Sequence, residues 1–287
     1  MIGQTGNRSD SVSEVLSRTF VQLVPTVVSD HDALCRILDD IARLGLGGAE
    51  LNIVNPDEFD LDGLATELGV RNLTMSSYAT GGDANTHGLS ISSTDDDLRR
   101  RSIDRCRRYV EVASRFNASI ILGFMKGGPG GDTDERRRLL VDSLKEIAPK
   151  AEDLGVTIEL EATNHYEAAC AVTVAETVGL ADQAGSQVVC VLPDTYHMNI
   201  EEPSTVASLA RHAGRYVNLH LSDNNRFFPG YGGIDFAEIL ALLEGLGYEG
   251  RFGIEGRLCE SFDSDLERAV TCLAEAAERA SASWRAR

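Results

Sequence analysis

Short apolar runs alternate with longer amphipathic stretches along nearly the whole sequence, and this alternation constrains the fold more than any other feature. The run FVQLVPTVV (20–28) predicts a strand, and HDALCRILDDIARLG (31–45) places apolar residues at helical spacing. No linker rich in Pro, Gly or Ser interrupts the pattern. Such a pattern is typical of a parallel sheet whose strands are joined by helices within one domain.

The alternation occurs eight times, although the second and third connections are the least regular. The remaining strands are expected at 47–53, 73–79, 118–124, 156–162, 188–194, 216–222 and 251–256. The remaining helix patterns span 95–115, 135–155, 169–185, 201–214, 235–247 and 265–280. Eight strand–helix units in 287 residues predict an α/β protein that forms a single closed (β/α)8 TIM barrel.

The barrel domain is expected to cover residues 19–287. Residues 1–18 are a polar stretch that we expect to lead into the first strand with about one helical turn. A doubly wound open sheet is the structural alternative, but no G-x-G-x-x-G motif follows the first strand to support a dinucleotide fold.

Charge and composition argue against several classes of protein. The formal net charge is −18, whereas a nucleic-acid-binding surface needs Lys and Arg to neutralise phosphates. No apolar run approaches the ~18 residues of a membrane span, and the N-terminus has no basic start followed by an apolar segment. The six cysteines form no C-x-x-C pair, which argues against a disulfide framework or a thiolate zinc site. Together these features predict a cytoplasmic protein.

Four strands in the second half of the sequence end on a side chain that can bind a metal ion. They are Glu161 in IELEATNH, Asp194 in VLPDTYH, His220 in VNLHLSD and Glu255 in FGIEGR. These positions recur roughly once per strand–helix unit, which is about 31 residues in a barrel of ~250 residues. Because barrel enzymes carry their chemistry at the carboxyl ends of the strands, we expect the four side chains to meet at the barrel mouth.

Each of these residues also has an ordinary structural interpretation. A polar residue after a strand often caps the next helix, as Asp194 can, and His220 between two leucines can be a core histidine. Three carboxylates at one mouth, however, would repel one another and raise their pKa values unless a cation neutralised them. One imidazole with three carboxylates suits Mn²⁺, with Mg²⁺ or Co²⁺ as alternatives, whereas Zn²⁺ more often takes thiolates or several histidines. The sequence therefore predicts one divalent cation.

Four segments around these residues resemble motifs of the xylose isomerase-like barrel superfamily, and within it the tagatose 3-epimerase and psicose (allulose) 3-epimerase group. The segments are LEATNHYE (160–167), DTYHMNIEE (194–202), HLSDNNRFFPGYGGIDF (220–236) and IEG (254–256). The specific motifs cover roughly residues 155–260, and the first half resembles only the general barrel pattern.

The resemblance assigns roles to individual residues. It implies metal ligands at Glu161, Asp194, His220 and Glu255. It implies contacts to substrate hydroxyls from Glu167, His197 and Arg226. It also implies that Glu161 and Glu255 act as an acid/base pair. In DTYHMNIEE, Glu201 and Glu202 fit the first turn of the next helix, where negative charge meets the helix dipole.

The reaction implied by the resemblance is the C3 epimerisation of a free ketose. This chemistry removes a proton from a carbon next to a carbonyl and passes through a metal-bound cis-enediolate. Carboxylates on opposite faces of the planar intermediate, from Glu161 and Glu255, allow one to take the proton and the other to return it. The expected partner is a small sugar, and the resemblance implies a homodimer or homotetramer.

Three features depart from the epimerase pattern or lie outside it. His165 stands where the epimerases usually carry Arg. The glycine-rich segment GFMKGGPGGD (123–132) can cradle an anion that Lys126 pairs with, or it can be a flexible lid. Glu50 ends the second strand and either lines the pocket or is a strand-end acid without a specific partner.

Two further functions compete with the epimerase. The first is a metal-dependent lyase on the same scaffold, similar to inosose dehydratase, 3-dehydroshikimate dehydratase or a C-glycoside-cleaving subunit, which expels a hydroxide or other leaving group. The second is a non-catalytic sugar-binding or complex-forming subunit. The presence of all four ligands and both candidate bases favours an enzyme.

Overall fold

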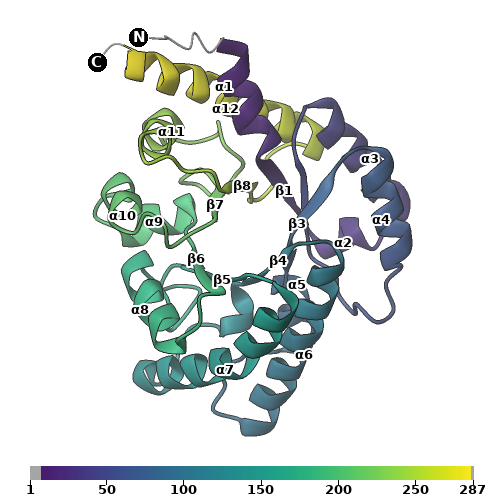
Figure 1. The fold of residues 1–287 in the computed structure, drawn as a ribbon, viewed down its shortest axis with the longest axis vertical. Coiled ribbons are helices and arrows are strands. Elements are labelled where there is room, and N and C mark those ends of the chain that lie inside the picture. Colours follow the sequence, from purple (N-terminus) through teal and green to yellow (C-terminus); the bar gives the residue numbers. More distant parts are fainter. Residues whose placement is uncertain (1–7, 286–287) are drawn as a thin grey trace.

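The computed structural model describes residues 8–285, in which eight parallel strands form a barrel enclosed by helices (Figure 1). The strands are β1 (Thr19–Leu23), β2 (Gly48–Leu51), β3 (Thr74–Ala79), β4 (Ser119–Leu122), β5 (Ile158–Glu161), β6 (Val189–Leu192), β7 (Asn218–Leu221) and β8 (Arg251–Ile254). The predicted TIM barrel is confirmed.

The strands are connected by helices that cover the outside of the barrel. The helices of the first half are α1 (Arg8–Ser17), α2 (Pro25–Val28), α3 (His31–Arg43), α4 (Leu61–Val70), α5 (Gly81–His87), α6 (Asp96–Arg115) and the 3₁₀ turn η1 (Phe124–Lys126). Those of the second half are α7 (Thr133–Leu154), α8 (Val174–Ala184), α9 (Thr195–Glu201), α10 (Thr205–Arg211), α11 (Phe236–Gly245) and α12 (Phe262–Arg285). Among the described residues, no helix is both long and apolar enough to cross a membrane.

The sheet ladder runs in the order β6-β5-β4-β3-β2-β1-β8-β7 and nearly closes. Between β6 and β7 the regular pairing gives way to an isolated bridge between Asp194 and His220. Here the backbone N–H of His220 donates to the carbonyl of Pro193 at 2.9 Å. The seam of the barrel therefore lies at two of the predicted metal ligands.

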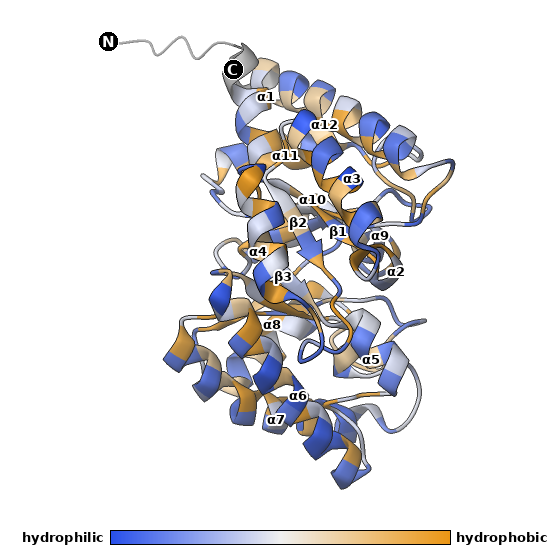
Figure 2. Ribbon diagram, turned by 90° about the vertical axis from the view of Figure 1, so that its right-hand side faces the viewer, coloured by the Kyte–Doolittle hydropathy of each residue, from blue (hydrophilic) through white to orange (hydrophobic). Residues whose placement is uncertain are grey.

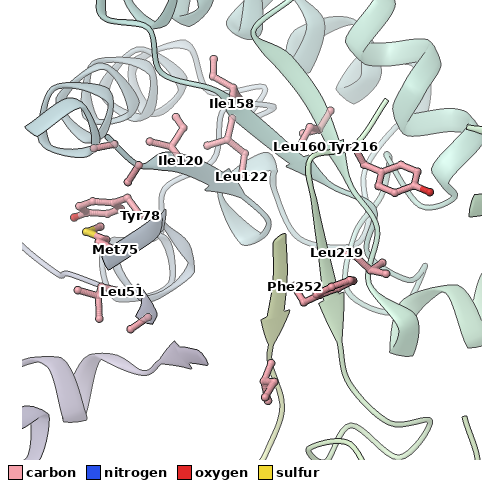
Figure 3. Close-up of a cluster of buried hydrophobic side chains, with 14 of the residues drawn as sticks. Leu51, Met75, Tyr78, Ile120, Leu122, Ile158, Leu160, Tyr216, Leu219 and Phe252 are labelled. Atoms are coloured by element: carbon pink, nitrogen blue, oxygen red, sulfur yellow. The ribbon is translucent and has the colours of Figure 1, made fainter. Parts of the chain in front are cut away.

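Side chains of the strands alternate between the barrel interior and the helices, as the sequences IELE in β5 and NLHL in β7 indicate. The outward-facing residues belong to one large buried cluster, which Figure 3 shows with Leu51, Ile120, Ile158, Leu160, Leu219 and Phe252. The helices pack against it with one apolar face, as in α3, where Leu34, Leu38 and Ile41 are buried. Hydrophilic and hydrophobic segments alternate along the helices in Figure 2. This arrangement leaves the interior positions free for polar side chains.

Three local predictions differ from the structure. The expected strand 20–28 ends at Leu23, because Pro25 starts the short helix α2, where its fixed φ suits a first turn. The expected helix 201–214 is shorter and corresponds to α10, and a separate helix, α9, precedes Pro203. Glu201 is the last residue of α9, so the placement of Glu201 and Glu202 in a first turn is wrong.

The N-terminal segment is more helical than expected. Helix α1 has 10 residues rather than about one turn, and it packs along α12, the last helix (Figure 1). Residues 1–7 of the predicted lead-in and residues 286–287 lie outside the described part of the chain.

Candidate metal centre and active site

The carboxyl ends of β5 to β8 bring the four predicted ligands into one group. One ligand atom from each of Glu161, Asp194, His220 and Glu255 lies within 4.8 Å of the others. His220 Nδ1 is 2.7 Å from Glu255 Oε2, 3.7 Å from Glu161 Oε1 and 3.9 Å from Asp194 Oδ2. One imidazole nitrogen thus faces three carboxylates, a donor set that can hold a divalent cation.

Glu161 has a buried oxygen that fits a bound cation. Its Oε1 has no hydrogen-bond partner among the described residues, and a buried oxygen without a partner costs free energy. Gly123, which follows β4, leaves room for the same carboxylate, since a Cβ at this position would lie 2.2 Å from Glu161 Oε2. A cation in the group would supply the partner that Oε1 lacks.

Asp194 caps the following helix and also faces the candidate metal group. Its Oδ1 accepts hydrogen bonds from the backbone N–H groups of Tyr196 at 2.7 Å and His197 at 3.4 Å, which caps α9. Its Oδ2 accepts from Arg226 Nη1 at 2.6 Å and faces His220. The cap starts α9 directly after β6, which is why the helix ends rather than begins near Glu201.

Arg226 bridges two members of the group. Its Nη1 binds Asp194, and its Nη2 donates to Glu255 Oε1 at 2.7 Å. The residue has a φ of 65°, a left-handed conformation that is uncommon outside glycine and recurs at functional sites. The backbone holds it there, because its N–H donates to Asp223 O and its own carbonyl accepts from Arg257 N.

Charges within the group shift the pKa values of two of its members, Glu255 and His220. Burial alone would raise the pKa of Glu255, but the charges of Arg226 and His220 lower it below its usual value. Burial alone would lower the pKa of His220, but the surrounding carboxylates of Glu50, Glu161 and Glu255 raise it well above its usual value. The group therefore attracts positive charge strongly.

The predicted substrate contacts His197 and Glu167 lie beside this group. His197 is buried, and its Nδ1 accepts a hydrogen bond from the backbone N–H of Asn164 at 3.2 Å. The proton of the neutral ring is therefore on Nε2, which lies 3.9 Å from Glu161 Oε1. Glu167 Oε1 accepts from Asn164 Nδ2 at 3.1 Å. One asparagine thus orients both side chains.

A cavity of about 230 Å³ opens above the group. Its lining includes all the residues predicted to touch the substrate or to act as acid and base, namely Glu161, Glu167, His197, Arg226 and Glu255. Asp194 and His220 are fully buried and are not part of the lining. The rest of the lining includes Gln22, Asn52, Asn85 and Phe124.

Lys126 is not positioned to pair with an anion in the glycine-rich segment. Lys126 is 1% exposed, and its Nζ donates to the carbonyl of Glu161 at 2.5 Å and to Thr163 Oγ1 at 2.6 Å. Burial lowers the pKa of Lys126 to about 8. The side chain therefore supports the end of β5 and does not face the glycine-rich segment 127–131.

His165 and Glu202 also have partners that their sequence motifs did not indicate. His165 is exposed, and both its backbone N–H and its Nδ1 contact Glu201 Oε1, which joins the loop after β5 to the end of α9. Glu202 Oε1 accepts from the backbone N–H of Val174 at 2.8 Å, at the start of α8. Neither residue lines the cavity.

A second group of potential ligands lies on the surface between α3 and α4 and is a poorer metal site. It consists of His31, Cys35 and Glu67. The carboxylate of Glu67 is already bound by Arg71 Nη1 at 2.6 Å. Burial and the carboxylate of Glu67 raise the pKa of Cys35, so the thiol stays protonated. The group at the barrel mouth is therefore the candidate centre.

Comparison with known proteins agrees with this geometry. A D-psicose 3-epimerase from Ruminiclostridium cellulolyticum is 40% identical over 225 residues, which cover 76% of each chain. An L-ribulose 3-epimerase from Mesorhizobium japonicum is 27% identical over 245 residues, covering 84% of this chain and 81% of that protein. The structure of a D-allulose 3-epimerase from Methylomonas sp. in complex with D-allulose superposes with a TM-score of 0.73 at 23% identity, covering 94% and 97% of the two chains. Residues 38–276 match the family described as the xylose isomerase-like TIM barrel, and the chain belongs to that family.

Proposed function

We propose that the protein is a divalent-metal-dependent 3-epimerase of a free ketose, with Mn²⁺ as its ion. The observation that carries the proposal is that Glu161 and Glu255 belong to the candidate metal group and also line the cavity, whereas Asp194 and His220 lie beneath it. The names of the relatives, which are ketose 3-epimerases, support the same reaction. Cytoplasmic location and a homodimer or homotetramer remain predictions.

The cavity residues divide the chemistry of epimerisation among them. A divalent cation held by Glu161, Asp194, His220 and Glu255 polarises the ketose carbonyl and the neighbouring hydroxyl when it is bound. One of Glu161 and Glu255 takes the C3 proton, the electron pair of the C–H bond forms a C2–C3 double bond, and the π electrons of the C2 carbonyl move onto its oxygen. The other carboxylate returns a proton to the opposite face of C3, which inverts its configuration.

The remaining polar residues orient the sugar. His197 can donate its Nε2 proton to a sugar oxygen, and Glu167 can accept a hydrogen bond from a hydroxyl. Arg226 is the cationic residue of the lining, and Asp194 and Glu255 already take its charge. No Lys and no further Arg lines this cavity among the described residues, so a phosphate group would lack a partner. A free ketose fits this lining better than a sugar phosphate.

Incubation of the Mn²⁺-loaded protein with a panel of ketohexoses in D₂O tests the proposed reaction. We expect a C3 epimer to form, with deuterium at C3 of both the product and the recovered substrate. The measurement is NMR combined with sugar chromatography. If no ketose exchanges its proton, and a keto acid or keto-inositol instead loses water, the protein is a lyase.

The acid/base pair makes a separate prediction. Glu255→Gln removes the charge and basicity of one carboxylate but keeps an oxygen that can bind the cation. We expect the variant to retain much of its Mn²⁺ binding and to exchange the C3 proton at least roughly 10²-fold more slowly. Exchange is followed by NMR and binding by calorimetry. Wild-type exchange in this variant would refute the mechanism with two carboxylates.

A further inference from the structure

We infer that Glu50 is a positioning residue for the metal centre: it accepts the Nε2 proton of His220 and thereby leaves the Nδ1 lone pair facing the other ligands. The inference rests on the proposed metal centre. It assigns a role to a buried carboxylate that lies outside the cavity and touches no part of the substrate site.

The contacts of Glu50 are those of a fixed hydrogen-bond acceptor. Its Oε2 lies 2.9 Å from His220 Nε2, and neither side chain is exposed. Its Oε1 accepts from Asn218 Nδ2 at 2.8 Å. Both oxygens of this carboxylate are therefore engaged.

The backbone is adapted to bring Glu50 and His220 together. They lie on β2 and β7, which are separated in the sheet by β1 and β8. On β8, Gly253 lies between them, and a Cβ there would be 2.7 Å from both Glu50 Oε1 and His220 Cδ2. The register of β2 against β3 shifts between Ala49 and Glu50. Such irregularities re-aim a side chain and are frequent next to active sites.

The chemistry of imidazole gives this contact its consequence. A neutral ring carries one proton, and the nitrogen without the proton is the one that can bind a metal. An ionised carboxylate can only accept, so Glu50 holds a proton on Nε2. Nδ1 faces the carboxylate of Glu255 at 2.7 Å, and a cation bound there would take the place of a proton on Nδ1. A glutamine at position 50 can turn its NH₂ group toward Nε2. The ring proton would then move to Nδ1, in the space that the cation needs.

Glu159 provides a matched control within the same barrel interior. It is also a fully buried glutamate, and it also accepts from Asn218 Nδ2, at 3.3 Å. Its main partner is Arg251 Nη2 at 2.6 Å, and it contacts none of the four candidate ligands. Glu159→Gln therefore disturbs the buried polar network without reaching His220.

The test is Mn²⁺ binding by isothermal titration calorimetry to the metal-free wild type, E50Q and E159Q, with circular dichroism as a check on folding. We expect the Kd of E50Q for Mn²⁺ to rise roughly 10–100-fold, because partners of ligating histidines have effects of this size. E159Q should lose thermal stability and keep the wild-type Kd. An unchanged Kd for E50Q, or an equal rise for E159Q, would overturn the inference.

A measurement on the wild type alone covers the case in which E50Q does not fold. Histidine side-chain ¹H–¹⁵N spectra of the Mg²⁺-loaded protein should show His220 protonated at Nε2, and a proton at Nδ1 would contradict the role of Glu50.

The proposed metal centre and the inferred role of Glu50 can also fail separately. A wild type that binds neither Mn²⁺ nor Mg²⁺ refutes the metal centre and the inference together, whereas normal binding by E50Q refutes only the inference.

Discussion

Gly123 lies where a side chain would collide with the carboxylate of Glu161. Its substitution by alanine therefore tests whether the position of this carboxylate matters for activity. In Gly123→Ala, the new Cβ would lie 2.2 Å from Glu161 Oε2, and the carboxylate has to move away. The backbone angles at this position, φ −89° and ψ −97°, fall outside the main regions allowed for alanine, so we also expect some loss of stability, which the melting temperature of the variant measures. Epimerase activity and Mn²⁺ affinity should each fall by about 10-fold or more, because displacement of a ligand alters the first coordination shell.

Gly128→Ala is the control for this substitution. It lies in the same segment, and a Cβ there would meet nothing within 4 Å. We expect it to retain wild-type activity and Mn²⁺ affinity. Equal losses in both alanine variants would mean that flexibility of the segment, rather than room for Glu161, matters for activity.

Sequence reasoning could find the residues that follow a strand end, but not the partners that depend on distant chain segments. Glu161, Asp194 and Glu255 recur with the strand period, which makes them visible. The contact of Glu50 with His220 joins residues 170 positions apart and requires a glycine on a third strand. The burial of Lys126 under β5 is hidden for the same reason.

At the level of helices and strands, the alternation of apolar runs and amphipathic stretches predicted the strands and the long helices. It did not predict the short helices whose ends are set by capping residues and prolines. The start of α9 was misplaced: Asp194 was considered as a cap, but the next helix was expected from residue 201, whereas α9 begins at Thr195. The apolar run that begins in β1 continues through α2 to Val28, and only Pro25 marks the change from strand to helix. Short elements bury too few residues for a period to be visible, so their caps and prolines decide their boundaries.

Glu202 gives a prediction at the scale of these elements. Its carboxylate accepts from the first residue of α8, where a negative charge favours the helix dipole. Glu202→Gln keeps an oxygen acceptor but removes the charge. We expect the free energy of unfolding to fall by about 0.3–1 kcal/mol, measured by urea denaturation, with normal catalysis. Glu249→Gln, an exposed glutamate outside the helices, should leave stability unchanged, and equal effects of the two variants would contradict the role of Glu202 in capping α8.

At the scale of the whole molecule, the candidate metal group lies at the seam of the barrel. Three carboxylates meet where the ladder between β6 and β7 is reduced to the bridge of Asp194 with His220. Removing the cation with a chelator should abolish activity and lower the melting temperature, because a ligand that binds only the folded state stabilises it.

Hydrogen exchange can locate this effect. After chelation, amides of β6 and β7 should exchange faster, whereas those of β2 and β3, which are paired on both sides, should not change. Mass spectrometry of peptides from the four strands gives the comparison. Uniform acceleration throughout the barrel, or no change at β6 and β7, would contradict the closure of the seam by the metal group.

The position of the seam also determines how the chain would come apart. The two ends of the described chain are fastened to each other, since β1 pairs with β8 and α1 packs along α12. The break in the ladder is internal, so a protease acting on the metal-free protein would first cut the backbone between β6 and β7. Such a nick would leave two fragments that remain associated through the pairing of β1 with β8.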